Sequence, residues 1–435
     1  MRVAYLTAGA GGMYCGSCLR DNALAAALIR SGRDVVLLPV YSPIRTDGPD
    51  VSDRRVFYGG INIFLQQKAA LFRHLPRFLD RLLSHPSLLR LAMKRAGAAS
   101  PKTAAPLVVS ILRGEAGRQR KELGRLIAGL ADLRPDLVHL PNAFFVGLAA
   151  PIKRELAAAV VCTLTGEDVL LEKLPEPAKS EALALIRSHG TDVDAFLSVS
   201  RYYAAYAAER FGIAPERIHP IPLGIPIEDE SGEPDRARTP PATDDRPFTI
   251  GYLARVCPDK GLHVLCDAFR ILHDRNRACR LVAAGYIGTG DRGYLRDIQA
   301  DMARCGLDRV IDFRGEVDRA EKLAMLRSID VLSVPTVYRE AKGLYVLEAL
   351  SQGVPVVSPR HGAFPELIEA TGGGLLVEPH DPTALADALG RLMDDAELRG
   401  SLGSAGRAAV RSSFTDEIMA TAAWAVFERV AGKPR

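Results

Sequence analysis

The sequence predicts an α/β protein with two doubly wound domains, each a parallel sheet covered by helices on both faces. Short apolar runs with strand character alternate with helical patterns along most of the chain. The alternation stops at residues 227–247, which are polar and rich in Pro and Asp, as linkers are. A chain of 435 residues has room for two or three cores. We therefore expect two domains of similar size, whose loops face a central cleft.

The first half predicts a domain over residues 1–226. A helix around Asn22–Arg30, ended by Gly32, is expected between its first two strands. A basic helical insertion is expected at about 61–125. The strands are expected in the segments RVAYLTA, DVVLLPV, LVHLPN, AVVCTLT, AFLSVS and HPIPLG.

After the 227–247 linker, the second half predicts a domain over residues 248–413. A last helical segment is expected at 414–435, and it could pack back on the first domain. The strands are expected in the segments FTIGYLARV, RLVAAGYI, VIDFRGEV, DVLSVPT, VPVVSPR and GLLVEP.

Composition narrows the classes of function. A formal charge of +4, from 56 Lys and Arg against 52 Asp and Glu, gives no support for nucleic-acid binding. Seven scattered cysteines, no signal-peptide pattern and no run of 18 apolar residues predict a cytoplasmic protein. Residues 61–96 carry many cations and the single acid Asp80. We favour a solvated helical insertion there; contact with the inner membrane face is the alternative.

The segment GGMYCGSC, residues 11–18, allows several readings. Cys15 and Cys18 have the spacing of a redox pair or of half a zinc site, but no second ligand pair at zinc spacing follows. Gly11 and Gly12 follow the first strand, where glycines let a phosphate or a sugar approach the backbone. We favour a ligand-binding loop with thiols that line or pack, and keep redox chemistry as the alternative.

The most informative stretch is VPTVYREAKGLYVLEALSQGVPVV, in which Glu340 and Glu348 are separated by seven residues. A helix that begins near Gly343 offers free N–H groups, from Leu344 onward, to a diphosphate. Glu340 would then meet sugar hydroxyls before the helix, and Glu348 a ribose one turn inside it. Two surface glutamates are the simpler reading of the pair alone.

Other segments strengthen the functional reading. Arg255 and Lys260 flank a turn after a strand, where two cations can converge on a pyrophosphate and neutralise a leaving nucleotide. The turn in FRGEV, which ends at Val317, can bring its backbone to a nucleobase. Each of these features alone is typical of an ordinary loop. Their order along the chain is what indicates a function.

That order resembles the family 4 retaining glycosyltransferases, which have the GT-B fold. The motifs are G-x-L-x-R-x(4)-K-G, F-x-G-x-V, D-V-L-x-x-P-x(4)-E-x(7)-E-A, G-V-P-V-V and G-x-x-P-E, over about 250–380. The first half is similar through its glycine loop and the segments at 134–142 and 196–225. The resemblance implies a nucleotide-diphosphate sugar on the C-terminal domain and a sugar, lipid or small-molecule acceptor on the N-terminal domain, with UDP the commonest nucleotide.

The resemblance also implies roles for residues. Glu340 lies at the reacting centre of the sugar, Glu348 holds the ribose, and Arg255 and Lys260 clamp the diphosphate with the N–H groups of Gly343 and Leu344. The leaving phosphate itself helps to deprotonate the acceptor, so no protein nucleophile is needed. Neither a metal nor another cofactor is expected.

The sequence departs from the family at two places. Thr165 stands where many members have a histidine that contacts the donor sugar, and threonine can be neither a cation nor a base near pH 7. Glu167 or Asp168 is then a candidate for part of that role. Lys342 occupies a position that is often aromatic, and we expect it to face solvent.

Three other classes remain as alternatives. A nicotinamide-dependent oxidoreductase would share the doubly wound domains, but AGAGGMYCG lacks a clean G-x-G-x-x-G and no acid ends the second strand. An epimerase or a phosphorylase of the same fold is a second alternative. A non-catalytic sensor of nucleotide sugars is the third, although a sensor would not need Glu340.

Overall fold

A computed structural model describes residues 1–9, 15–53, 101–227 and 247–432. These residues form two compact units: unit 1, Met1–Gly224 with Asp416–Arg435, and unit 2, Ile225–Thr415. Gly11, Gly12, the basic segment 61–96 and nearly all of the predicted linker 227–247 lie outside the described residues. The predictions made for them therefore stay predictions.

Unit 1 is built on a parallel six-stranded sheet with the order β2-β1-β3-β4-β5-β6. The strand order reverses between β1 and β3, which makes the carboxyl ends of these strands the switch point of the sheet. The strands are β1 (Arg2–Thr7), β2 (Asp34–Pro39), β3 (Leu137–Leu140), β4 (Ala159–Leu164), β5 (Ala195–Ser198) and β6 (Ile218–Pro220).

Helices cover both faces of this sheet. In β1, Val3 and Tyr5 pack into one apolar cluster with two helices, while Ala4 and Leu6 are equally buried on the opposite face. The described helices of unit 1 are α1 (Gly16–Arg30), α5 (Pro101–Leu112), α6 (Arg120–Leu133), α7 (Ala149–Leu156), α8 (Asp168–Leu171), α9 (Ala178–His189), α10 (Arg201–Phe211) and α18 (Asp416–Ala431).

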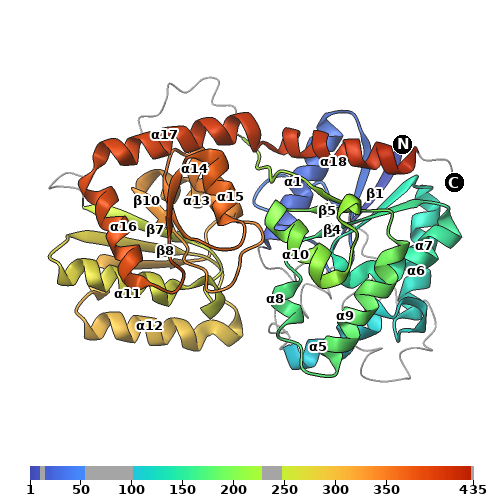
Figure 1. Cartoon of the computed structure of the whole chain (residues 1–435), viewed down its shortest axis with the longest axis horizontal. Helices are drawn as coiled ribbons and strands as arrows, with labels where there is room; N and C mark the ends of the chain where they lie inside the picture. Colours follow the sequence, from blue (N-terminus) through green and yellow to red (C-terminus); the bar gives the residue numbers. More distant parts are fainter. Residues whose placement is uncertain (10–14, 54–100, 228–246, 433–435) are drawn as a thin grey trace. The chain divides into compact units, whose positions relative to one another are not determined.

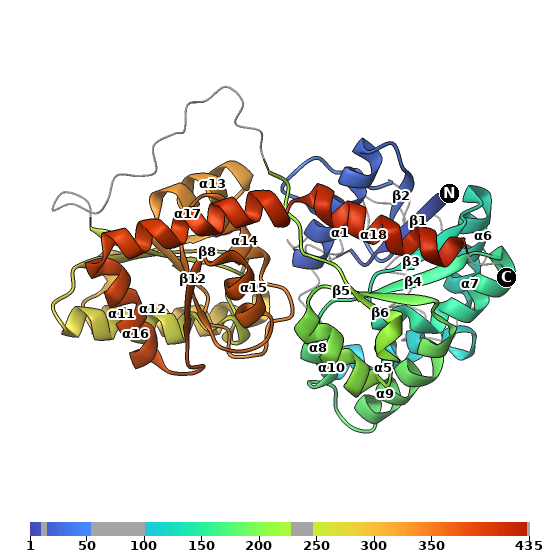
Figure 2. The same ribbon diagram turned by 45° about the horizontal axis from the view of Figure 1, so that its top comes forward.

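The C-terminal helix α18 belongs to unit 1. Its apolar face, including Trp424 and Phe427, packs in the same cluster as α1 and the first strands, and α1 and α18 lie side by side in both views (Figures 1 and 2). The chain thus leaves unit 1 near residue 224 and returns to it at residue 416.

Helix α1 is longer than the sequence predicts. It begins at Gly16 rather than near Asn22, and it ends at Arg30, with Gly32 at φ +75°. The added turns contain Arg20 and Asp21, which are buried although charged. These two side chains interrupt the apolar pattern by which the first turns of a buried helix are recognised.

Unit 2 is built on a second parallel six-stranded sheet, with the order β12-β11-β10-β7-β8-β9. Here the strand order reverses between β7 and β10, as in a nucleotide-binding doubly wound sheet. The strands are β7 (Phe248–Leu253), β8 (Cys279–Ala284), β9 (Ile311–Gly315), β10 (Val331–Ser333), β11 (Val356–Pro359) and β12 (Gly374–Val377).

The core of unit 2 lies between this sheet and its helices, with α11 and α16 in one apolar cluster with β7 and β8. Two helix starts follow from capping residues: Asp318 and Glu321 form a reciprocal capping box at α13, and Asp381 caps α16. The helices of unit 2 are α11 (Leu262–Asp274), α12 (Arg292–Arg304), α13 (Arg319–Ser328), α14 (Leu344–Ser351), α15 (Phe364–Thr371), α16 (Pro382–Asp394) and α17 (Ala396–Ser413).

The two sheets confirm the prediction of two doubly wound α/β domains. No helix within the described ranges is both long and apolar enough to cross a lipid bilayer.

Candidate active site

Two of the three residues predicted to act in catalysis, Lys260 and Glu340, meet at the switch point of the unit 2 sheet. Lys260 ends a 3-10 turn (Pro258–Lys260) that follows β7, and Glu340 lies between β10 and α14. Because β7 and β10 are neighbouring parallel strands, both residues lie at the same carboxyl edge. The structure brings their side chains into direct contact, as an ion pair between Lys260 Nζ and Glu340 Oε2.

Glu340 is a buried carboxylate that stays charged. It is 4% exposed. Burial alone would raise its pKa, but the Lys260 ammonium and hydrogen bonds from Lys260 and Tyr338 outweigh burial and lower the pKa to about 2. The Tyr338 hydroxyl donates to Oε2 at 2.6 Å. The carboxylate is therefore held ionised throughout the physiological pH range.

The backbone around Glu340 depends on a close approach by Gly362. A Cβ at Gly362 would lie 2.4 Å from the carbonyl oxygen of Glu340, and the glycine itself adopts φ +60°. The next residue, Ala363, donates its N–H to the same carbonyl oxygen at 2.7 Å. The G-x-x-P-E motif thus braces Glu340 from the start of α15.

Helix α14 starts where the sequence predicts. Gly343 is its N-cap, at φ +87°, and Leu344 is its first residue. Glu348 lies just over one turn inside the helix, where its Oε1 accepts a hydrogen bond from Lys322 Nζ at 2.6 Å. Lys322 comes from α13, so the second glutamate is also paired with a lysine.

Arg255 and Val317 lie at the same edge of the sheet but do not join this cluster. Arg255 is exposed after β7, and its Nε contacts the Cys257 sulfur at 3.3 Å. Val317 is half-buried in the turn between β9 and α13. Both positions are compatible with a ligand above the strand ends.

In unit 1, Glu167 fixes the turn after β4. Its carboxylate accepts the backbone N–H groups of Ala143, Thr165 and Gly166 at 3.0–3.1 Å and the hydroxyl of Tyr203 at 2.8 Å. With these donors, Glu167 has little capacity left for a ligand. Its carboxylate holds the backbone of Thr165 in place.

Asp168 differs from Glu167. Its Oδ1 is buried and has no hydrogen-bond partner among the residues that the structure describes. Burial, and then the charge of Glu167, raise the pKa of Asp168 to about 6. Of the two acids considered for the missing histidine's role, Asp168 is the one with an unused oxygen.

A buried polar cluster below this edge is absent from the sequence prediction. Arg20 and Asp21 form an ion pair at 3.1 Å with side chains 5% and 2% exposed. Asp21 also accepts the hydroxyls of Tyr5 and Thr7, and Arg20 donates to Tyr5 at 2.7 Å and to Thr163 at 3.3 Å. The cluster ties α1 to the ends of β1 and β4. From the sequence alone, Arg20 and Asp21 would be expected on the exposed face of a helix, because they are charged.

The two cysteines of GGMYCGSC are free thiols at the start of α1. Cys15 is the N-cap residue and Cys18 is buried. A hydrogen bond with Cys15 and burial raise the pKa of the Cys18 thiol. Because the thiolate is the reactive form, this environment favours packing over redox chemistry at Cys18.

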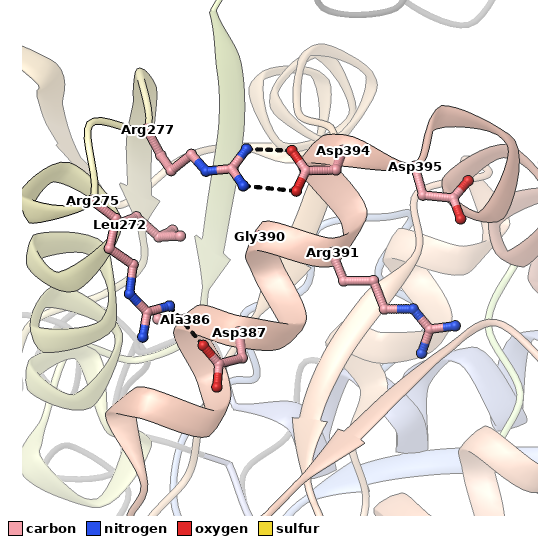
Figure 3. A pocket seen from close by; sticks show the side chains of 9 residues that line it. All are labelled: Leu272, Arg275, Arg277, Ala386, Asp387, Gly390, Arg391, Asp394 and Asp395. Atoms are coloured by element: carbon pink, nitrogen blue, oxygen red, sulfur yellow. Dashed lines mark hydrogen bonds and ion pairs between the residues drawn. The ribbon is translucent and has the colours of Figure 1, made fainter.

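One surface recess of unit 2 lies away from the predicted site (Figure 3). Arg275 and Arg277, in the loop before β8, form ion pairs across it with Asp387 and Asp394 on α16. This loop is at the amino ends of the strands, opposite to the edge that carries Glu340. Since the charges are largely neutralised in pairs, the recess offers little to a charged ligand.

Among the described residues, potential metal ligands are not gathered at the carboxyl edge of either sheet. Within the described ranges, no group of three or more His, Cys, Asp or Glu side chains is arranged to hold a metal ion. Metal independence stays a prediction that activity measurements must test.

Sequence reasoning missed two residues that touch the predicted glutamates, Tyr338 and Lys322. Tyr338 lies two residues before Glu340, but nothing in the local pattern shows that its side chain turns back to the carboxylate. Lys322 is 26 residues before Glu348, and only the packing of α13 against α14 brings them together. Neither contact has a signal in local periodicity.

Comparison with protein-family models assigns both halves of the chain to glycosyltransferases. Residues 235–409 match the model of the glycosyl transferases group 1, and residues 91–229 match that of glycosyltransferase family 4. A GDP-mannose-dependent alpha-(1-6)-phosphatidylinositol monomannoside mannosyltransferase of Mycolicibacterium smegmatis is 30% identical over 62% of this chain and 72% of the relative. A D-inositol 3-phosphate glycosyltransferase of Corynebacterium jeikeium is 35% identical over 36% of this chain, and the match spans only 38% of that relative's length.

Solved structures agree on the fold. A sucrose-phosphate synthase from Thermosynechococcus elongatus superposes with a TM-score of 0.68 at 17% identity, over 99% of this chain and 100% of the other. The Anabaena protein HepE in complex with UDP gives 0.64 at 17% identity, over 99% and 100%. These likenesses confirm the predicted GT-B fold. Together with the sequence matches, they show that this chain belongs to the family 4 glycosyltransferases.

Proposed function

We propose that the protein is a retaining glycosyltransferase, which moves a sugar from a nucleotide-diphosphate sugar to an acceptor hydroxyl. The donor is bound by unit 2, and no metal or other cofactor is needed. The observation that carries the proposal is the ion pair of the buried Glu340 with the half-buried Lys260 at the switch point, beside the start of α14.

The chemistry follows from what these groups offer. A diphosphate needs positive charge and N–H donors, which Lys260, Arg255 and the first turn of α14 supply. A donor sugar needs fixed hydrogen-bond acceptors for its hydroxyls, and Glu340 stays ionised to provide them. Glu348, one turn into the helix, is placed to take the ribose.

The proposed reaction takes place on one face of the sugar. The bond from the anomeric carbon to the leaving phosphate breaks, and a phosphate oxygen receives the proton of the acceptor hydroxyl that attacks from the same face. The cations at the diphosphate stabilise the charge that develops there, while Glu340 orients the sugar. This scheme uses preorganised charge and requires no protein nucleophile.

The names of relatives suggest which substrates to try. The mycobacterial relative is named as GDP-mannose-dependent, and HepE has also been solved with UDP-glucose. UDP is favoured only as the commonest nucleotide of the family that the sequence resembles, so UDP- and GDP-sugars both belong in a first panel. Inositol phosphates and lipid-linked mannosides are the acceptor classes that the relatives' names suggest.

The test is a turnover assay on the full chain. UDP-glucose, UDP-galactose, UDP-N-acetylglucosamine and GDP-mannose are each incubated with the acceptors, with and without EDTA. We expect nucleoside diphosphate release that depends on an acceptor and persists in EDTA, and a product whose NMR spectrum shows the donor's anomeric configuration. Binding of NAD(H) with no diphosphate release from any donor would instead support the oxidoreductase alternative.

A further inference from the structure

The Lys260–Glu340 ion pair includes a third member, the side chain of Tyr338. Its hydroxyl donates to Glu340 Oε2 at 2.6 Å and accepts a hydrogen bond from Lys260 Nζ at 2.7 Å. Lys260 also contacts Glu340 Oε2 directly. Three polar groups from two segments, the turn after β7 and the loop after β10, therefore close a small ring of hydrogen bonds.

This ring makes the two oxygens of Glu340 different from each other. Oε2 receives both Lys260 and Tyr338. Oε1 accepts a long hydrogen bond, 3.3 Å, from the backbone N–H of Lys342, and the buried Tyr345 hydroxyl also lies within reach of this carboxylate. A carboxylate oxygen can accept more than one hydrogen bond, so Oε1 is the oxygen with capacity for a ligand hydroxyl.

Tyr338 also acts on the cation of the pair. Lys260 Nζ lies 5.0 Å from the centroid of the Tyr338 ring and 5.3 Å from that of Tyr345, both within range of a cation–π attraction. A lysine has a long flexible side chain, and a single ion pair does not fix its orientation. With the phenol hydroxyl and two aromatic rings beside it, the ammonium group is restricted to one place.

We propose that Tyr338 is a positioning residue, which locks Lys260 and Glu340 into one geometry so that Oε1 of Glu340 is presented to the donor sugar. The inference rests on the proposed function for the identity of the ligand. It goes beyond that function in assigning a role to Tyr338, which stands at a variable position of the motif D-V-L-x-x-P-x(4)-E. Tyr338 itself need not touch the substrate.

The test compares Tyr338→Phe with a matched control, Tyr294→Phe. Tyr294 lies in the same unit, and its hydroxyl also makes two hydrogen bonds, to the N–H and Nδ1 of His263 at 3.0 and 2.8 Å. We expect Tyr338→Phe to lower kcat by about tenfold to a hundredfold, with the KM for the donor changed less than about threefold. The acid limb of its kcat–pH profile should move to higher pH, because Glu340 has lost a stabilising donor. Tyr294→Phe should stay within about twofold of the wild type.

A second variant separates the effect of the Tyr338 ring from the effect of its hydroxyl. Tyr338→Leu removes both, so its kcat should fall below that of Tyr338→Phe, which keeps the ring beside Lys260. Tyr338→Phe with the kcat and acid limb of the wild type would overturn the inference.

A measurement without substrate keeps the inference testable if no donor is found. Urea unfolding is measured between pH 3 and pH 7 for the wild type, Glu340→Gln, Tyr338→Phe and the double variant. Comparing each protein with its Glu340→Gln counterpart gives the acid-dependent stability that is due to Glu340, with and without Tyr338. We expect that contribution to shrink when Tyr338 is replaced. An unchanged contribution overturns the inference whether or not the wild type turns over a donor. If the contribution shrinks but no donor is turned over, the proposed function is wrong, while the effect of Tyr338 on Glu340 is confirmed.

Discussion

Glu340 and Asp168 both lie at the carboxyl edge of a parallel sheet, one in each unit. Their surroundings shift the pKa of the carboxyl group in opposite directions. Glu340 is almost fully buried and has a lysine and a tyrosine on it, and its pKa is about 2. Asp168 is only partly buried, has a glutamate as its neighbour and a buried oxygen with no partner within the described part of the chain, and its pKa is about 6. The difference shows that the partner, more than the depth of burial, decides whether a carboxyl group stays charged.

The comparison assigns different tasks to the two edges. A permanent charge suits unit 2, which we propose orients a donor in the same way in every catalytic cycle. A carboxyl group that titrates near pH 6 suits a place where charge is tolerated but not required. Four variants test this contrast, beginning with the one that should change the protein most.

Lys260→Met should make Glu340 resemble Asp168. With its cation removed, the buried carboxylate loses the partner that offsets desolvation, so its pKa should rise and turnover should be lost. Breaking a buried pair in this way typically costs about 3–5 kcal/mol of unfolding free energy. Urea unfolding at pH 7 measures this loss. A loss below about 1 kcal/mol would show that Lys260 is not what keeps Glu340 charged.

The acid dependence of stability should show the charge of Glu340 directly. Its pKa in the folded chain, about 2, is below the ordinary value of 4.5, so its stabilising contribution is fully present above pH 4.5 and is lost as pH falls toward 2. The contribution is about 3 kcal/mol at pH 7 by the linkage relation. Glu340→Gln should remove this acid-dependent part, as seen in unfolding free energies from pH 3 to pH 7. Equal pH slopes in the two proteins would contradict the pairing.

Asp168→Asn should act in the opposite direction. Because the pKa of Asp168 is raised in the folded chain, its contribution to stability is present below pH 3.8 and is lost as pH rises through 6. The neutral amide avoids that loss, so the variant should be more stable than the wild type at pH 7, by about 1–2 kcal/mol after allowance for solvent screening. The two proteins should be equally stable near pH 4, and a variant that is less stable at pH 7 would refute this account.

These three expectations also show how far the sequence could go. Gly343 and the glutamate spacing predicted the start of α14 and the place of Glu340 before it, because both are local features. The contacts of Tyr338 and Lys322 depend on how separate segments pack, and the sequence had no means to show them. Arg20 and Asp21 were missed because buried ionic residues on a helix look like exposed ones.

The smallest change is expected for Lys322→Met. Glu348 is 21% exposed at its side chain, against 5% for Glu340, so water can replace part of what the lysine provides. We expect about 1 kcal/mol or less of lost stability and about three- to tenfold weaker binding of the nucleoside diphosphate, with kcat within about twofold. Titration calorimetry with UDP or GDP and with the 2′-deoxy forms would show whether discrimination against the deoxyribose also falls. A Lys322→Met protein with the same affinities as the wild type would show that Lys322 has no part in the proposed ribose site.

The central claim is that the charged edge of unit 2 carries the transfer reaction, and Glu340→Gln measured beside Asp168→Asn tests it most directly. Both substitutions replace a carboxylate with an amide of nearly the same shape, and turnover is measured with binding of the nucleoside diphosphate. We predict that Glu340→Gln loses at least about a hundredfold in kcat while its affinity for the nucleotide changes less than about threefold, and that Asp168→Asn keeps kcat within about tenfold of the wild type. A Glu340→Gln protein that turns over the donor like the wild type, or one that loses nucleotide binding together with turnover, would contradict it.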